Sequence, residues 1–375
     1  GGAKGMKAMM QSNFEGFAQN AYCAAPEKTT KPYDGLSSDR MWSFETGDLD
    51  VLRRHIPEAA VVTPVIFNRT DFKHRDCKTQ GTAKGVSPDY VAVENPKLSH
   101  GRYIQEADLR NCRKVCVLGE KMASQLFPND RNPVGKYIEM QGIYFQVVGI
   151  SSLTSNVGVG GPASRSVYMP YTTLQRLLGC GDHFDMLALT TRPGHTVSSI
   201  QRKIELEIKK LHRIDPNDQP ALTSINVESM FQMIQSLFDG INILVWMIGI
   251  GTLLSGSIGV SNIMMVVVKE RTTEIGVRRA LGAHPSHILV QILTESAVLT
   301  LLAGLTGIVF AVLILAAADS GIGSNFPSLA PGSFLISFSM AIGSALALSA
   351  LGTVAGVAPA LRALAIKPVD AMRDE

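Results

Sequence analysis

Three long stretches without a charged residue constrain what this chain can fold into. No Asp, Glu, Lys or Arg occurs in residues 240–268, 296–318 or 320–361. A helix needs roughly 20 apolar residues to cross a bilayer, so we expect membrane-spanning helices at about 240–268, 287–318 and 333–360. Buried helices of a large soluble protein rarely lack charge for so long. The sequence therefore predicts a membrane protein with an α-helical transmembrane bundle.

The basic residues predict how these spans are oriented, because short cytoplasmic loops carry an excess of Lys and Arg. The connector 269–286 has four basic and two acidic residues, the loop 319–332 has no basic residue, and the tail 361–375 has three (Arg362, Lys367 and Arg373). We expect the connector and the tail in the cytoplasm. The loop 319–332 and residues 1–239 then lie outside.

Residues 1–239 are predicted to form one large α+β extracytoplasmic domain. A helical pattern at 47–57 is followed by a β-branched run at 59–67, and the order strand, helix, strand recurs at 184–192, 196–214 and 221–227. The repetition suggests two similar halves, about 18–75 and 182–227, with a strand-rich subdomain of about 76–181 inserted between them. Its clearest strands are 115–120, 137–150 and 166–171. After 226 the pattern turns helical and enters the first span without a proline.

Motifs for catalysis or cofactor binding are absent from the sequence. PVGKY (133–137) lacks the upstream Gly and the Ser/Thr of a phosphate-binding loop, and SNVGVGGPASR (155–165) has the composition of a mobile loop. The histidines form no metal-binding helical pair, and nothing resembles a nucleophile elbow. A formal charge of +3 gives no support for nucleic-acid binding. We expect no catalytic residue, metal or cofactor in this chain.

All five cysteines lie in the predicted outer domain, where disulfides are permitted. They are Cys23, Cys77, Cys112, Cys116 and Cys180. An odd number leaves at least one thiol unpaired in a monomer. One disulfide and a set of plain buried thiols both remain open, and the sequence identifies no pair.

Small residues recur every four positions in two of the spans, which lets helix backbones approach closely in lipid. They are Gly251, Ser255 and Gly259 in the first span, and Gly352 and Gly356 in the last. Packing between two subunits and packing within one subunit both fit this pattern. Glu295 lies about two turns into its helix, near the cytoplasmic interface, where Arg278 or Arg279 could pair with it.

The connector KERTTEIGVRRALGA (269–283) is predicted to be a short rigid helix lying parallel to the membrane. Glu274 and Arg278 stand at i, i+4 in the favoured order, and Gly282 is a natural helix stop. A rigid connector is suited to receiving a push from a soluble partner.

Together with the following ILTESAVLTLLAGLTGI, this connector resembles the cytoplasmic coupling helix and next span of FtsX/MacB-type ABC transporter permeases. GVAPALRALAIKPVDAMRDE resembles their C-terminal tail. Residues 101–150 and SVYMPYTTLQRLL resemble a MacB-like periplasmic core domain. The resemblance covers nearly the whole chain, and EIGVRRALGA is its most specific element.

This resemblance implies a multi-pass protein of the inner membrane with its large domain in the periplasm. It implies four spans, so the first would precede Gly1, and a dimer of permeases, either homo- or heterodimeric. Residues 18–75 with 182–227 would form a porter-like subdomain. The connector would dock on a cytoplasmic ABC ATPase that binds ATP and Mg, either separate or fused upstream. The implied docking residues are Arg271, Glu274, Ile275, Arg278, Arg279, Leu281 and Gly282.

The function implied is mechanotransmission: ATP hydrolysis shifts the spans, and the spans move the outer domain. A MacB-type permease would export small molecules, peptides or proteins through a periplasmic adaptor and an outer-membrane duct. A lipoprotein-extracting permease of the LolC/LolE kind and an FtsX-like regulator of a cell-wall hydrolase are the alternatives. About 240 residues in two subdomains suit gripping an adaptor or cargo better than regulation.

Overall fold

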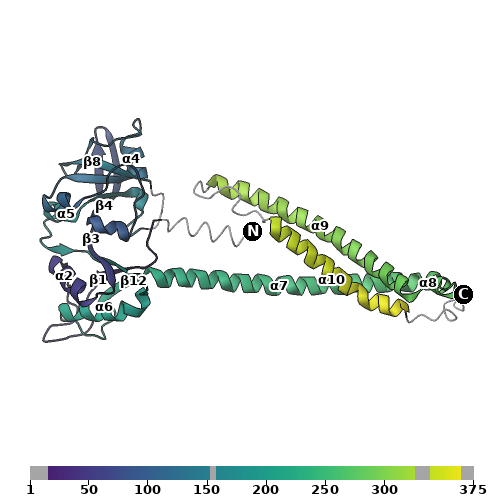
Figure 1. Cartoon of the computed structure of the whole chain (residues 1–375). Helices are drawn as coiled ribbons and strands as arrows, with labels where there is room; N and C mark the ends of the chain where they lie inside the picture. The colour runs from purple at the N-terminus through teal and green to yellow at the C-terminus, as the bar shows by residue number, and fades with distance from the viewer. Residues whose placement is uncertain (1–15, 153–157, 326–337, 365–375) are drawn as a thin grey trace. The chain divides into compact units, whose positions relative to one another are not determined.

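The computed structural model describes residues 16–152, 158–325 and 338–364 (Figure 1). It separates into an α+β unit that ends at Gln235 and a helical unit that begins at Ser236. Parts of several predicted segments lie outside the described residues: the first fifteen residues, the beginning of the glycine-rich loop, 326–332 of the outer loop, the start of the third span, and the tail from 365 on, with Lys367 and Arg373.

A ten-stranded sheet organises the α+β unit, in the order β12-β1-β11-β3-β4-β9-β6-β8-β5, with β7 paired to β3 and β8. The strands are β1 Ala21–Pro26, β3 Ala59–His74, β4 Cys77–Val86, β5 Leu98–Gly101, β6 Val115–Gly119, β7 Tyr137–Met140, β8 Ile143–Ser151, β9 Ser166–Pro170, β11 Met186–Thr191 and β12 Leu222–Asn226. A separate pair is formed by β2 Phe44–Glu45 and β10 His183–Phe184.

The two predicted strand–helix–strand halves come together at one end of this sheet. Helix α2 (Thr46–His55) connects β1 to β3, and α6 (Val197–Leu211) connects β11 to β12. The strand order β12-β1-β11-β3, antiparallel throughout, is the ferredoxin-like arrangement. The predicted elements at 47–57, 59–67, 184–192, 196–214 and 221–227 are therefore confirmed as a helix, a strand, a strand, a helix and a strand.

The inserted part is built on the rest of the sheet, with helices α3 (Glu106–Arg110), α4 (Glu120–Leu126) and α5 (Tyr171–Leu178) and the 3-10 turns η1 (Pro88–Ala92) and η2 (Ala163–Arg165). The division from the porter-like part falls inside β3, which pairs with β11 up to Val65 and with β4 from Ile66. The sequence places it later, at about residue 75, because a continuous strand gives no boundary signal.

One predicted strand is two strands in the structure. The run 137–150 is broken into β7 and β8 by a two-residue turn at Gln141 and Gly142, whose φ values of 51° and 79° are both positive. Positive φ at both central residues is typical of the hairpin turn that matches strand twist. Gly142, inside an otherwise β-rich run, is the sequence feature that indicates this turn.

Hydrophobic side chains cover both faces of the sheet, which gives the α+β unit two cores. Tyr22 and Ala24 of β1 belong to a core beneath α2, α4, α5 and α6, whereas Ala21 and Cys23 belong to a second core with η1 and Tyr168. This alternation follows the two-residue period of a strand. The predicted face of α6 is confirmed, since Val197, Ile200, Ile204 and Ile208 are buried and Leu211 is half-buried.

All five cysteines are free thiols, with Cys23 and Cys116 buried and the other three half-buried. Burial raises the pKa of the Cys23 thiol to about 12, which keeps it protonated and unreactive. Of the two arrangements that the sequence permits, the structure has free thiols.

The second core encloses a buried ion pair. Lys84 on β4 and Glu94, just after η1, have side chains 0% and 2% exposed, with Nζ 3.2 Å from Oε2. The same carboxylate accepts hydrogen bonds from the hydroxyls of Tyr90 (2.8 Å) and Tyr168 (3.1 Å). Burial lowers the pKa of Lys84, while the Glu94 charge opposes that shift. Four partners thus satisfy one another inside an apolar core.

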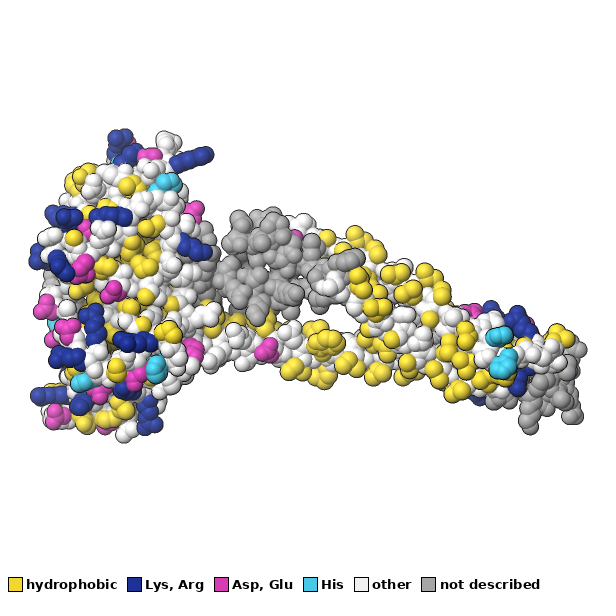
Figure 2. Space-filling view, viewed as in Figure 1, with side chains coloured by type: hydrophobic (Ala, Val, Ile, Leu, Met, Phe, Trp, Pro, Cys, Tyr) yellow, Lys and Arg dark blue, Asp and Glu magenta, His cyan; other side chains and the backbone are white. Residues whose placement is uncertain are grey.

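In the part of the chain that the structure describes, three helices are long and apolar enough to cross a membrane: α7 (Val227–Glu270, which begins in the α+β unit), α9 (Pro285–Asn325) and α10 (Phe338–Leu364). They contain the described parts of the three predicted spans. Large hydrophobic side chains are exposed along all three, as Figure 2 shows in yellow. Exposed apolar surface on this scale marks a membrane or an interface. The helix α8 (Thr272–Ala280) connects α7 to α9.

Candidate functional site

The candidate site is α8, the helix predicted to lie in the charged connector. Glu274 stands in its first turn and Arg278 and Arg279 in its last, so each charge interacts favourably with the helix dipole. The helix ends at Ala280, and Gly282 follows with a φ of 93°, a left-handed conformation that glycine adopts without steric cost. The predicted stop and the Glu274–Arg278 pair (2.6 Å) are both confirmed.

Ile275 anchors α8 in a small core of the helical unit. It is 9% exposed and packs in a cluster with Met264 and Val268 of α7, Ile288 and Ile292 of α9, and Ala360 and Ala363 of α10. Ile275 is one of the docking residues that the resemblance implies, and in this structure its side chain is covered by its own chain.

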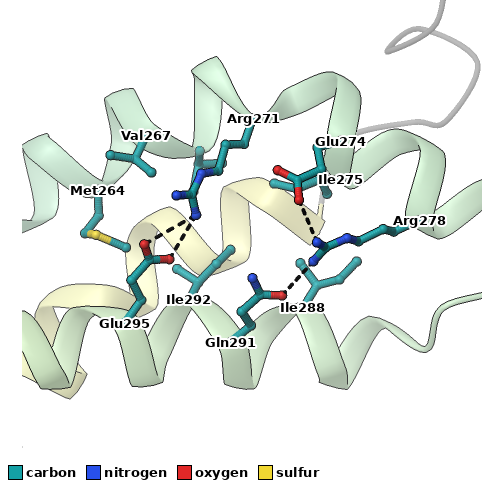
Figure 3. A pocket seen from close by; sticks show the side chains of 11 residues that line it. Met264, Val267, Arg271, Glu274, Ile275, Arg278, Ile288, Gln291, Ile292 and Glu295 are labelled. Carbon is teal, nitrogen blue, oxygen red and sulfur yellow. Dashed lines mark hydrogen bonds and ion pairs between the residues drawn. The ribbon is translucent and has the colours of Figure 1, made fainter.

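Polar contacts then fix α8 against α9 (Figure 3). Arg271 Nη1 donates to both carboxylate oxygens of Glu295, each at 3.3 Å. Arg278 donates to Glu274 on its own helix and, at 3.0 Å, to Gln291 on α9. The sequence expects Glu295 to pair with Arg278 or Arg279. It pairs with Arg271 instead, the residue between α7 and α8, which lies opposite the third turn of α9.

The third arginine of the connector reaches α10. Arg279 Nη1 donates to the backbone carbonyl of Leu364, the last described residue of α10, at 2.8 Å. Arg271, Arg278 and Arg279 therefore all have contacts within the chain. Arg271 and Arg278 attach the connector to α9, and Arg279 attaches it to α10.

A small cavity of about 30 Å³ lies under these contacts, lined by side chains of α7, α8 and α9 that include Met264, Arg271, Ile275, Ile292 and Glu295. Such a volume holds about one water molecule. A cavity of this size is too small for an organic ligand.

Two large apolar side chains are exposed at α8, beside the half-exposed Glu274 and Arg278. Leu281 is 84% exposed and Val277, one turn earlier on the same face, is 42% exposed. Leu281 was predicted as a docking residue and is free to contact a partner; Val277 was missed, although its i, i+4 spacing from Leu281 could have revealed it. Gly282, also among the predicted docking residues, directly follows Leu281.

The small residues of the spans fall into two groups. A Cβ on Gly352 would meet Thr300 at 2.5 Å and one on Gly356 would meet Ser296 at 2.9 Å, so these two glycines of α10 pack directly on α9. Ser296 also donates to the Gly352 carbonyl, at 2.9 Å. Nothing lies within 4 Å of a Cβ on Gly251 or Gly259, and Ser255 is exposed. Packing within one subunit accounts for the small residues of α10 but not, among the described residues, for those of α7.

Metal chemistry has no support in the described ranges, where no three His, Cys, Asp or Glu side chains are grouped to hold an ion.

Comparison with known proteins adds to this picture. The family model of the MacB-like periplasmic core domain matches residues 3–206, and that of the FtsX-like permease C-terminal matches residues 246–368. The pyoverdine export ATP-binding/permease protein of Pseudomonas syringae pv. syringae is 29% identical over 85% of this chain and 47% of its own length. The macrolide export ATP-binding/permease protein MacB of Acinetobacter baylyi is 29% identical over 88% and 47%.

The chain thus spans about half the length of the curated relatives it matches. Among solved structures, the periplasmic region of MacB from Actinobacillus actinomycetemcomitans is 20% identical, with a TM-score of 0.47, over 60% of this chain and 96% of that one.

Three apolar helices joined to a large α+β unit define a membrane protein with a sizeable domain outside the lipid. With both family models matched, the chain belongs to the FtsX/MacB-type permeases of ABC transporters, and its α+β unit is a MacB-like periplasmic domain.

Proposed function

We propose that this chain is the permease part of a MacB-type exporter. In this proposal it couples ATP hydrolysis in the cytoplasm to motion of its periplasmic domain, and it drives export of small molecules, peptides or proteins. ATP and Mg bind to an ABC ATPase, separate or fused, and not to this chain. The permease works as a dimer in the inner membrane, with a periplasmic adaptor and an outer-membrane duct as further partners.

The observation that carries the proposal is the construction of α8. Its arginines and Ile275 are used to fix it to α7, α9 and α10, while Leu281 and Val277 remain exposed. An exposed apolar pair on a helix held by three others is suited to receive force from a partner. The names of two relatives, a pyoverdine exporter and a macrolide exporter, favour export over lipoprotein extraction or regulation of a hydrolase.

The proposal sharpens which residues dock. Arg271, Glu274, Arg278 and Arg279 are assigned to holding α8 in place, and Leu281 with Val277 to the contact itself. A buried apolar anchor at the centre of an interface contributes about 2 kcal/mol or more, which corresponds to roughly a thirtyfold change in affinity.

The test is Leu281→Asp in the full transporter reconstituted in lipid. We expect loss of at least tenfold in ATP hydrolysis coupled to the permease, with the protein still folded and inserted. Leu281→Met should behave as wild type. Met41→Asp is the matched control, since Met41 is 69% exposed on the periplasmic domain. Normal ATP turnover in Leu281→Asp would exclude this face of α8 as the docking surface.

A further inference from the structure

The junction between the periplasmic domain and the first span has no linker. Strand β12 ends at Asn226 and α7 begins at the next residue, Val227, then continues to Glu270 (Figure 1). Val227 is 1% exposed and belongs to the second core of the α+β unit, and Phe231, one turn later, packs against the same core. The first turn of α7 is therefore part of the periplasmic domain.

Asn226 holds the start of α7 and reaches α6 at the same time. Its side-chain oxygen accepts a hydrogen bond from the backbone N–H of Ser229, at 3.0 Å, which is the usual geometry of a helix N-cap. Its side-chain nitrogen donates to Gln201 (2.9 Å) and Ser198 (3.2 Å) on α6. One side chain thus caps one helix and bonds another.

Glu228 supplies the opposite contact, from α7 to the N-terminus of α6. Its carboxylate accepts hydrogen bonds from the backbone N–H groups of Val197 (2.6 Å) and Ser198 (3.4 Å). The N-cap residue Thr196 makes no side-chain cap, and α6 has no acidic residue in its first turn. The negative charge that a helix N-terminus favours therefore comes from α7, 31 positions away in the sequence.

From these contacts we propose that Asn226 and Glu228 are positioning residues that hold the first turn of α7 on α6, so that movement of α7 carries the porter-like subdomain with it. This inference rests on the proposed function, because it specifies where motion of the span enters the periplasmic domain. Helix α6 loses the acceptor at its N-terminus when α7 separates from it, and Asn226 loses its bonds to Gln201 and Ser198, so the two helices resist separation.

The lock is first tested by a distance within one chain. The full transporter in lipid nanodiscs is prepared with the half-buried Cys77, Cys112 and Cys180 replaced by Ser, while Cys23 and Cys116 are kept because they are buried. Spin labels are then attached at two introduced cysteines.

The labelled positions are Leu206 on α6 (40% exposed) and Met233 on α7 (66% exposed). We expect a single narrow distance distribution that is the same without nucleotide and after trapping with ATP and vanadate. In Glu228→Ala the distance distribution should be at least twice as wide as in the native protein. In Glu228→Gln, which keeps an oxygen acceptor, its width should be close to the native value. The control Glu58→Gln removes a carboxylate that contacts Lys203 of α6 at 2.8 Å but is not on α7; it should leave the width unchanged.

The consequence for coupling is measured between the two copies of the assembled transporter. In the otherwise native protein, ATP and vanadate should change both the Met233–Met233 and the Leu206–Leu206 distance. In Glu228→Ala the first change should persist and the second should fall to less than half. If neither distance changes in the native protein, the proposed function fails, whereas the distribution within one chain still decides whether the lock exists.

A cross-link provides a test that does not depend on the stability of Glu228→Ala. The hydroxyls of Ser198 and Ser229 are 3.3 Å apart, so cysteines at both positions are close enough to form a disulfide. The oxidised cross-link should preserve the Leu206–Leu206 change in the native background and restore it in Glu228→Ala, and reduction should reverse the rescue. Loss of this change in the cross-linked native protein, or an unaltered narrow distribution in Glu228→Ala, would overturn the proposal.

Discussion

Lys84 and Glu94 show how one buried pair can determine the local packing of the periplasmic domain. Both charges are removed from water, and the cost is offset because the carboxylate accepts from Lys84, Tyr90 and Tyr168. Gly158 completes the site: a Cβ there would meet Glu94 Oε1 at 2.9 Å. The glycine-rich loop that the sequence predicts to be mobile thus has at least one glycine that is needed for close packing.

Removing one member of this pair should be costly. Lys84→Met leaves Glu94 buried without its cation, and we expect a loss of about 3–5 kcal/mol in the free energy of unfolding. The double variant Lys84→Met with Glu94→Gln should recover part of that loss. Lys203→Met, which breaks an exposed pair with Glu58, should cost under about 1 kcal/mol. Thermal unfolding of the full chain in detergent measures all three; equal effects of Lys84→Met and Lys203→Met would contradict this account.

Asp108 predicts how the domain responds to acid. Its side chain is fully buried, and it accepts two hydrogen bonds from Arg102 (2.6 and 3.2 Å) and one from the Gln105 backbone. Burial alone would raise the pKa of Asp108, but these bonds, with the nearby charges of Arg102 and Arg113, hold it below the ordinary value of 3.8. A lowered pKa stabilises the fold above the unfolded-state pKa, about 3.9, and this stability is lost as pH falls through the folded-state value.

Asp108→Asn should therefore lower the free energy of unfolding by about 2 kcal/mol at neutral pH. The difference from wild type should shrink below about pH 4, where Asp108 takes up a proton in the unfolded chain before it does so in the folded protein. Melting temperatures of the full chain from pH 7 down to pH 3 provide the measurement. A difference that stays constant over this range would show that the Asp108 charge does not contribute.

At the scale of elements, α8 is rigid because of its neighbours and not because of its own sequence. Nine residues are too few for a stable isolated helix. Ile275 in the small core, with the contacts to Glu295, Gln291 and Leu364, holds it in place. These polar contacts are about half exposed, so each contributes modestly, and their combined effect is to fix an orientation.

Charge reversal can test the contact between Arg271, at the start of α8, and Glu295 on α9. Arg271→Glu places two carboxylates opposite each other at Glu295, and we expect coupled ATP hydrolysis to fall severalfold because α8 is no longer held. Glu295→Arg alone should have a similar effect. The double reversal Arg271→Glu with Glu295→Arg should restore most of the activity. If the double variant is as impaired as the singles, the pair does not act through this contact.

Local periodicity was sufficient to predict most elements of the fold. The apolar stretches, the face of α6, the order of the two halves and the Gly282 stop all depend on residues close together in sequence. The partner of Glu295, the burial of Ile275 and the change of pairing within β3 depend on where other elements lie in space. Spacing cannot distinguish an arginine that holds α8 from one that contacts a partner, since both occupy the same face of the helix.

At the scale of the whole molecule, the two glycine patterns predict different interfaces. Gly352 and Gly356 are covered by α9, whereas Gly251, Ser255 and Gly259 of α7 are exposed. Small residues at a spacing of four bring helices close in lipid, where apolar surface alone gives no driving force for association. The α7 stripe is thus available to a helix that is not among those described, and the proposed dimer supplies a candidate in the second copy.

Bulky substitutions should separate these two roles. Gly352→Leu forces a side chain into Thr300, 2.5 Å from the Cβ position, and should lower the melting temperature of each chain and its yield in the membrane. A Cβ at Gly251 meets no described atom within 4 Å, so the melting temperature of Gly251→Leu should stay near that of wild type at a concentration where the chain is monomeric. Its self-association, measured by energy transfer between labelled copies in vesicles, should weaken at least fivefold, because the two backbones can no longer approach. If Gly251→Leu associates as strongly as wild type, the exposed small residues of α7 contact another helix of the complex. If the stability of the monomer drops strongly, α7 packs within its own chain more closely than the described helices indicate.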